Sequence, residues 1–136
     1  MRASALAGLA LAIASACGVA LAADEAKSAS PVASGVMHES LSGDPSREIV
    51  AITVVLPPGA DTGRHTHPGD QYTVVQEGEV RVLLDGQPPK VFKAGEGFHI
   101  NPGVIHRNQN ASTDGQARTT EFFIVAKGQP RTSPAK

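Results

Sequence analysis

The sequence is poor in cysteine and in aromatic residues. It has one Cys, no Trp, one Tyr and four Phe among 136 residues. A single cysteine excludes an internal disulfide and a metal site built from several thiolates. The scarcity of aromatic rings argues against a platform on which nucleic-acid bases stack. Charge points the same way, because 12 basic and 13 acidic residues leave a net charge of −1 and form no basic stripe.

The first 22 residues differ in composition from the rest of the chain. Arg2 is followed by an uncharged segment, Ala3–Ala22, that is rich in Ala, Leu, Ile and Val. This pattern predicts a secretory signal peptide, cleaved after Ala22, and a periplasmic or secreted protein. A membrane anchor is the alternative, but Ala, Ser and Gly dilute the segment. Cleavage would remove Cys17, the only thiol, and lipidation at Cys17 is a second alternative.

The remaining chain divides into a leader, a β domain and a tail. Residues 23–46 are rich in Ala, Ser, Gly and Pro and predict a flexible leader, and residues 127–136 predict a C-terminal tail. Between them, residues 47–126 form one domain without an amphipathic helix. Short runs rich in β-branched residues, separated by Gly and Pro turns, predict an all-β sandwich or barrel. The expected strands are Ile49–Leu56, Gln71–Gln76, Glu79–Leu84, Lys90–Lys93, Gly97–Ile100, Val104–Asn108 and Arg118–Ala126.

Two of these strands are separated by a very short connection. Gln71–Gln76 and Glu79–Leu84 are joined at Glu77 and Gly78. Because a short loop with glycine commonly joins antiparallel neighbours, the pattern predicts a β-hairpin.

Histidines are the residues with the clearest chemical meaning. His65 and His67 have the spacing that puts two side chains on one face of a strand, and His99 and His106 form a second cluster. Two imidazoles that face the same way can share a metal ion. An exposed polar strand face is the alternative when the pair is considered alone.

The surroundings of these histidines form two spaced motifs. Residues 59–78 read G-x5-H-T-H-x3-Q-x6-G, and residues 95–110 read G-x5-N-x-G-x2-H-x3-N. In spacing and order they resemble the two signatures of the cupin superfamily, and the resemblance extends over residues 47–126. It implies a single conical antiparallel β-barrel that holds one divalent metal ion. Transferred residue by residue, the implied ligands are His65, His67, Gln71 and His106.

Gln71 departs from the family pattern, which usually has Glu at this position. An amide offers only a neutral carbonyl oxygen, so the ion would keep its 2+ charge and favour an anionic ligand. Three imidazoles with one weak oxygen are also similar to the three-histidine iron sites of some cupin oxygenases. Ligation that is rich in nitrogen and lacks thiolate suits Fe, Mn, Ni, Cu or Zn.

Candidate residues for the pocket beside the metal are Tyr72, His99 and Phe123. Either Phe122 or Phe123 lines the barrel, depending on which face of the last strand turns inward. Core packing is the alternative role for these aromatic residues. Strand alternation favours an outward His99, because Phe98 and Ile100 share the opposite face.

Three arginines have two possible roles. Arg47, Arg64 and Arg107 are candidates for a carboxylate contact at the barrel mouth, with solvated surface charge as the alternative. His38 lies in the expected leader, where no role is assigned to it.

These observations predict an exported, metal-dependent enzyme of oxygenase, isomerase or lyase type that acts on a small oxygen-bearing metabolite. The alternative is a non-catalytic module that binds a metal or a small ligand. No nucleic-acid partner is expected, and neither is a stable membrane span after cleavage. A homodimer is expected because cupins often pair through exposed strands.

Overall fold

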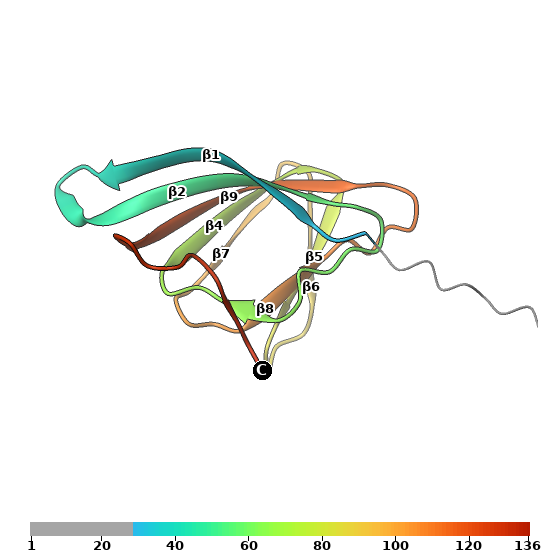
Figure 1. Cartoon of the computed structure of the whole chain (residues 1–136). Coiled ribbons are helices and arrows are strands. Elements are labelled where there is room, and N and C mark those ends of the chain that lie inside the picture. Colours follow the sequence, from blue (N-terminus) through green and yellow to red (C-terminus); the bar gives the residue numbers. More distant parts are fainter. Residues whose placement is uncertain (1–28) are drawn as a thin grey trace, which may run out of the picture.

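A computed structural model describes residues 29–136, which form two five-stranded antiparallel sheets (Figure 1). Sheet A has the order β1-β2-β9-β4-β7 and sheet B the order β10-β3-β8-β5-β6. The predicted all-β class is therefore confirmed. The strands are β1 (Val32–Leu41), β2 (Asp44–Leu56), β3 (His65–Thr66), β4 (Asp70–Glu77), β5 (Glu79–Leu84), β6 (Lys90–Lys93), β7 (Gly97–Ile100), β8 (His106–Gln109), β9 (Ala117–Ala126) and β10 (Ser133–Pro134).

The hydrophobic core lies between the two sheets. Along β2 and β9 the buried residues alternate with more exposed ones, as expected for strands with one face toward a core. Alternation on β9 places Phe123 inward and Phe122 on the opposite face. The other buried apolar residues are Ile52, Val54, Leu56, Ala60, Val75, Val80, Val82, Ile100, Ala117 and Val125.

The connection between β4 and β5 is a change of sheet, so the predicted hairpin is wrong. β4 pairs with β7 and β9 in sheet A, whereas β5 pairs with β6 and β8 in sheet B. Gly78 forms the corner with a φ of +71°, and a Cβ there would lie 2.7 Å from the carbonyl oxygen of Gln116. Gly78 therefore marks the corner at which the chain leaves sheet A for sheet B.

The predicted flexible leader is wrong for residues 32–46. β1 occupies Val32–Leu41 and β2 begins at Asp44, and the two strands pair along most of their length. Their connecting turn projects beyond the rest of the sheet (Figure 1). His38 lies on β1 and forms an ion pair with Glu48 at 2.9 Å, so it has a structural contact.

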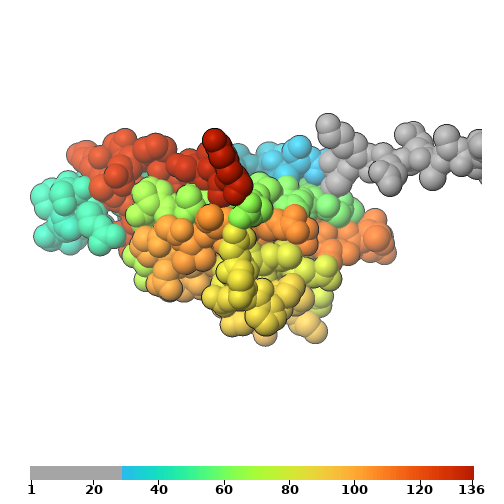
Figure 2. Space-filling view, turned by 90° about the horizontal axis from the view of Figure 1, so that it is seen from below, coloured from blue at the N-terminus to red at the C-terminus, as the bar shows by residue number. Residues whose placement is uncertain are grey.

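The predicted tail also contains a strand. β10 pairs with β3, so the chain returns to sheet B after β9. In the space-filling view, the C-terminal residues lie beside the start of β1 and the segment that carries β3 (Figure 2). This part of the prediction failed because a strand of only two residues, one of them Pro134, has no detectable periodicity.

The predicted signal peptide and the cleavage site after Ala22 lie outside the described residues. Among residues 29–136, no helix is long and apolar enough to cross a membrane.

Gly69 offers a test of how tightly β4 packs on β9. A Cβ at Gly69 would overlap the backbone carbonyl of Ile124, whereas a Cβ at Gly35 meets nothing within 4 Å. Because the backbone must move, we expect Gly69→Ala to lower the free energy of unfolding by about 2 kcal/mol or more. Gly35→Ala, the control, should change it by less than about 0.5 kcal/mol. Urea denaturation measures both, and equal stabilities would contradict this packing.

Candidate metal centre

Three histidines from one region of sheet B converge on a common point. His65 on β3 and His106 on β8 are register partners, and His67 follows β3 directly. One nitrogen of each ring lies within 4.8 Å of the corresponding nitrogens of the other two. His67 is 3% exposed and His106 is fully buried, while His65 is half-buried. The structure thus brings together the three histidines that the two motifs indicated.

A backbone carbonyl oxygen lies within hydrogen-bond distance of Nδ1 in each of the three imidazoles. A carbonyl oxygen only accepts hydrogen bonds, so each Nδ1 carries the proton and each Nε2 keeps a free lone pair. This is the tautomer that a metal ligand needs. The Nδ1 atoms donate to Gly63 from His65 at 2.8 Å, to Arg131 from His67 at 2.7 Å, and to Val104 from His106 at 3.1 Å.

Burial keeps two of these rings neutral. The pKa of both His67 and His106 is lowered to about 4, mainly by desolvation; repulsion from the neighbouring His65 adds to this lowering, and the hydrogen bonds to the backbone carbonyls oppose it. At neutral pH both rings therefore have the uncharged form that binds a metal.

The free lone pairs fit a divalent ion. The Nε2 atoms of His67 and His106 are buried and have no hydrogen-bond partner. Buried polar atoms without a partner are costly, so a group that accepts their lone pairs is expected between them. A transition metal ion binds imidazole nitrogen at about 2.0–2.1 Å, and one nitrogen of each of the three rings lies within 4.8 Å of the other two. The donor set therefore suits a metal centre.

Gln71 has a carbonyl oxygen available as well. The side chain is fully buried on β4, and its Nε2 donates to Thr73 at 3.1 Å and to the carboxylate of Glu121 at 3.2 Å. These acceptors fix the orientation of the amide, and its Oε1 is left buried without a partner. An oriented, unpartnered oxygen favours the ligand role, and coordination by Gln71 stays a prediction.

Glu121 is a functional candidate that the sequence analysis missed. It lies on the inward face of β9 and is 6% exposed. Desolvation raises the pKa of Glu121 to about 7, although the Thr119 hydroxyl, which donates to it at 3.1 Å, acts in the opposite direction. Its inward position follows from the same alternation that turns Phe123 inward, so fixing the phase of β9 would have revealed it.

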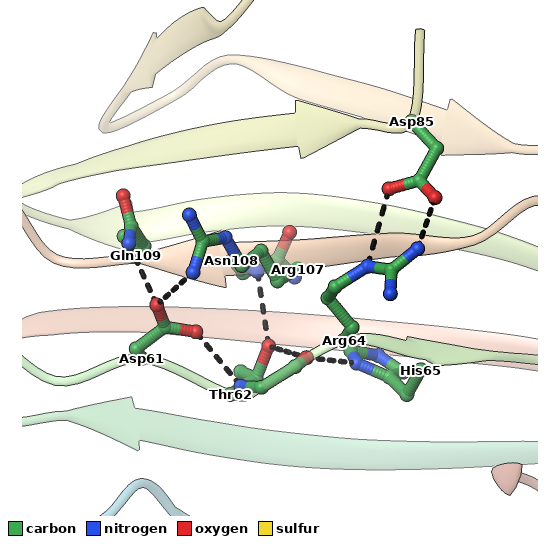
Figure 3. Close-up of polar contacts among 9 residues, drawn as sticks. Asp61, Thr62, Arg64, His65, Asp85, Arg107, Asn108 and Gln109 are labelled. Carbon is green, nitrogen blue, oxygen red and sulfur yellow. Dashed lines mark hydrogen bonds and ion pairs between the residues drawn. The ribbon is translucent and has the colours of Figure 1, made fainter. Parts of the chain in front are cut away.

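The turn before His65 is fixed by a single carboxylate (Figure 3). One oxygen of Asp61 accepts from the Gly63 amide at 2.8 Å, and the other accepts from Gln109 at 2.6 Å and from Arg107 at 3.2 Å. Gly63 has a φ of +73° and offers its carbonyl to His65. Asp61 therefore orients His65 through the backbone of the turn.

The C-terminal segment holds the opposite side of the centre. Arg131 accepts a hydrogen bond from His67 through its carbonyl, and the Thr132 hydroxyl lies 3.3 Å from the same Nδ1. β10 then pairs with β3, and the Ala135 amide donates to the Arg64 carbonyl at 3.1 Å. Residues predicted as a tail thus support the strand that carries His65 directly.

A cavity of about 350 Å³ opens beside the histidines. Its apolar wall includes Ile52, Val54 and Phe123, and the Phe123 ring packs on His67 with 4.7 Å between ring centroids. Its polar lining includes His65, His67, Thr62, Asn108, Glu121 and Arg131. A site of this size suits a small metabolite.

Two predicted pocket residues lie elsewhere. Tyr72 is 45% exposed, and its ring stacks on His99 with 4.5 Å between centroids. His99 lies within 2.8 Å of the Asp70 carboxylate. Both side chains are on the outer face of sheet A, because alternation turns them away from the core that contains Gln71 and Ile100. Phe123 alone of the three candidates borders the cavity beside the histidines.

The predicted carboxylate-binding arginines each have a partner within the protein. Arg64 borders the cavity, and the side chains of Arg47 and Arg107 are partly exposed. The pairs are Arg64 with Asp85, Arg47 with Asp70 at 4.0 Å, and Arg107 with Asp61 at 3.2 Å.

The fold and the histidine site place the chain in a known family. Residues 52–123, more than half of the chain, match the family model of the cupin domain. The chain therefore belongs to the cupin family, as the two motifs predicted. A comparison with curated protein sequences gives no significant match.

Solved structures share the fold. A Klebsiella pneumoniae protein with a double-stranded β-helix domain is 22% identical, with a TM-score of 0.62 over 78% of this chain and 80% of that one. A cupin-like protein of Thermotoga maritima is 26% identical, with a TM-score of 0.57 over 64% of each chain. The DMSP lyase DddQ of Ruegeria pomeroyi is 18% identical, with a TM-score of 0.62 over 85% of this chain and 56% of the lyase.

Removal of residues 131–136 tests the support of His67. The truncated chain loses the carbonyl and the hydroxyl that contact Nδ1 of His67. Because loss of such a contact typically weakens metal binding 10- to 100-fold, we expect a loss of about that size. Competition titration of Zn²⁺ against a chelator measures it. Removal of residues 135–136 alone is the control and should change the affinity much less, and equal affinities for all three proteins would contradict the role of this segment.

Proposed function

We propose that the protein is a metal-dependent enzyme that binds one divalent transition metal at His65, His67 and His106 and acts on a small oxygen-bearing metabolite. Gln71 is the proposed fourth ligand. When bound, such an ion supplies Lewis-acid chemistry toward an oxygen atom of the substrate and, if it is redox-active, electron transfer. The residues around it orient the ligand and limit the access of water.

The cavity beside the histidines carries this proposal. A metal held only for storage or structure is expected to be closed by protein ligands. Here His65 and His67 border a cavity of about 350 Å³, which leaves space for a ligand next to the ion. Glu121 borders the same cavity and adds a buried carboxyl group that can hold a proton. A module that only stores a metal ion needs neither feature.

The structural neighbours support an enzyme only in general terms. The lyase DddQ of Ruegeria pomeroyi has the same fold at 18% identity, so this fold accommodates catalysis. The reaction class of the present protein stays open among oxygenase, isomerase and lyase chemistry, and the metal open among Fe, Mn, Ni, Cu and Zn. Identification of the metal is therefore the first step.

Metal content tests the proposed centre. We expect the protein isolated without a His tag to contain about one equivalent of a transition metal, measured by plasma mass spectrometry. The double substitution His65→Ala and His67→Ala should abolish binding, because it removes two of three ligands. The pair His38→Ala and His99→Ala is the matched control, since both of these histidines lie outside the site.

Two outcomes would contradict the proposal. Absence of metal in the wild-type protein, even after reconstitution with each candidate ion, would refute the centre. Metal that binds without an exchangeable water, measured by proton relaxation of the Mn²⁺ or Co²⁺ form, would instead favour a closed, non-catalytic site.

We also propose export, on the composition of residues 1–22 alone. Expression of the full chain in a Gram-negative host should give a periplasmic protein that begins at Ala23, as measured by intact mass. A protein that keeps residues 1–22 in the cytoplasm would contradict this, and a lipid-modified Cys17 would indicate a membrane-attached form.

A further inference from the structure

Arg131 is a cationic side chain that borders the cavity beside the histidines. It belongs to the C-terminal segment, and its guanidinium carbon lies 5.4 Å from the centroid of the Phe123 ring. The same ring packs on His67. Stacking on an aromatic face fixes the plane of a guanidinium group and leaves its N–H edge free. Arg131 and the proposed metal ligand His67 therefore both contact the Phe123 ring.

Arg131 forms no close ion pair of the kind that several other arginines form, although its charge acts to lower the pKa of the Glu121 carboxyl on the same cavity wall. Among residues 29–136, no Asp or Glu oxygen lies within 4.0 Å of its guanidinium nitrogens, and its Nε is buried without a hydrogen-bond partner. By contrast, four other arginines form ion pairs: Arg47, Arg64, Arg107 and Arg118. A buried cationic donor without an acceptor is unfavourable, so a ligand is the natural source of the acceptor.

We propose that Arg131 recognises a carboxylate group of the ligand in this cavity. The inference rests on the proposed function and adds a substrate class to it. A guanidinium group donates two parallel N–H bonds, which match the two oxygens of a carboxylate. The cavity volume of about 350 Å³ limits the ligand to a small acid.

Asn108 adds a second requirement for the ligand. Its Oδ1 is buried without a hydrogen-bond partner, and the residue also borders the cavity. An amide oxygen accepts hydrogen bonds, so it suits a ligand with a donor such as a hydroxyl group. The combined features favour a small carboxylic acid that carries a hydroxyl group, with the carboxylate at Arg131.

Isothermal titration of the Zn²⁺-loaded protein tests this assignment. The probes are acetate, lactate, malate and succinate, and the matching neutral amides serve as controls for the charge. We expect at least one acid to bind, and Arg131→Met to weaken that binding 10-fold or more, because a charge-assisted contact is lost. Arg131→Lys should restore only part of the affinity, since it keeps the charge without the planar fork. The amides should bind weakly and should not respond to these substitutions.

The matched control is Arg81→Met. Arg81 is exposed on β5, away from the cavity, and its loss changes the net charge by the same amount. It should leave the affinity for the acids unchanged. Binding that Arg131→Met and Arg81→Met weaken equally would overturn the assignment, and so would binding of none of the four acids.

Metal content and stability are measured on the same samples. If Zn²⁺ fails to bind the wild-type protein, the metal centre of the proposed function fails, and titration of the metal-free protein still tests Arg131. If Zn²⁺ binds at one equivalent and the acids bind with an affinity that Arg131→Met does not change, only the present inference fails. Equal Zn²⁺ stoichiometry and equal unfolding midpoints of Arg131→Met and wild type will show that the C-terminal segment remains in place.

Discussion

The structure around the centre depends on hydrogen bonds from three imidazole Nδ1 atoms to backbone carbonyls. Burial keeps His67 and His106 neutral, which limits the repulsion among three rings that lie this close together. The carbonyls of Gly63, Val104 and Arg131 then select one of the two neutral tautomers for each ring. All free lone pairs consequently face the same small volume. Without this constraint the same residues would be three buried polar side chains with unsatisfied atoms.

That constraint explains why distant parts of the chain meet at the centre. Two of the carbonyls are local, because Gly63 and Val104 each lie two residues before the histidine they contact. The third is remote, since Arg131 is separated from His67 by 64 positions in the sequence. Pairing of β10 with β3 brings this carbonyl into place, so an edge strand of two residues has a role in ligand orientation. It also places the Arg131 side chain at the cavity.

The sequence predicted the site better than it predicted the connections. Motif spacing identified His65, His67 and His106, and alternation favoured the outward His99. Turn composition could not tell whether Gly78 folds the chain back within one sheet or sends it to the other, so the hairpin was wrong. β1 and β10 were missed because edge strands need no apolar face and leave a weak pattern. Placing Glu121 in the site required the strand phase of β9, and placing Arg131 there required the position of β10. Neither of these structural features can be read from the local sequence.

Gln71 and Glu121 together suggest how the centre balances charge. Where the family usually has a Glu ligand, the present chain has an amide, but the carboxylate of Glu121 accepts a hydrogen bond from that amide at 3.2 Å. Glu121, whose pKa is raised to about 7 by burial, thus places an ionisable carboxyl group one hydrogen bond away from the amide. When the amide N–H of Gln71 donates to a carboxylate, the whole amide group becomes more polarised. Its carbonyl oxygen is then a better ligand for a metal ion. In the proposed centre, the neutral amide oxygen of Gln71 holds one coordination position, while the carboxyl group of Glu121 stays at the cavity wall. The substitution therefore separates two roles that a single Glu ligand would combine.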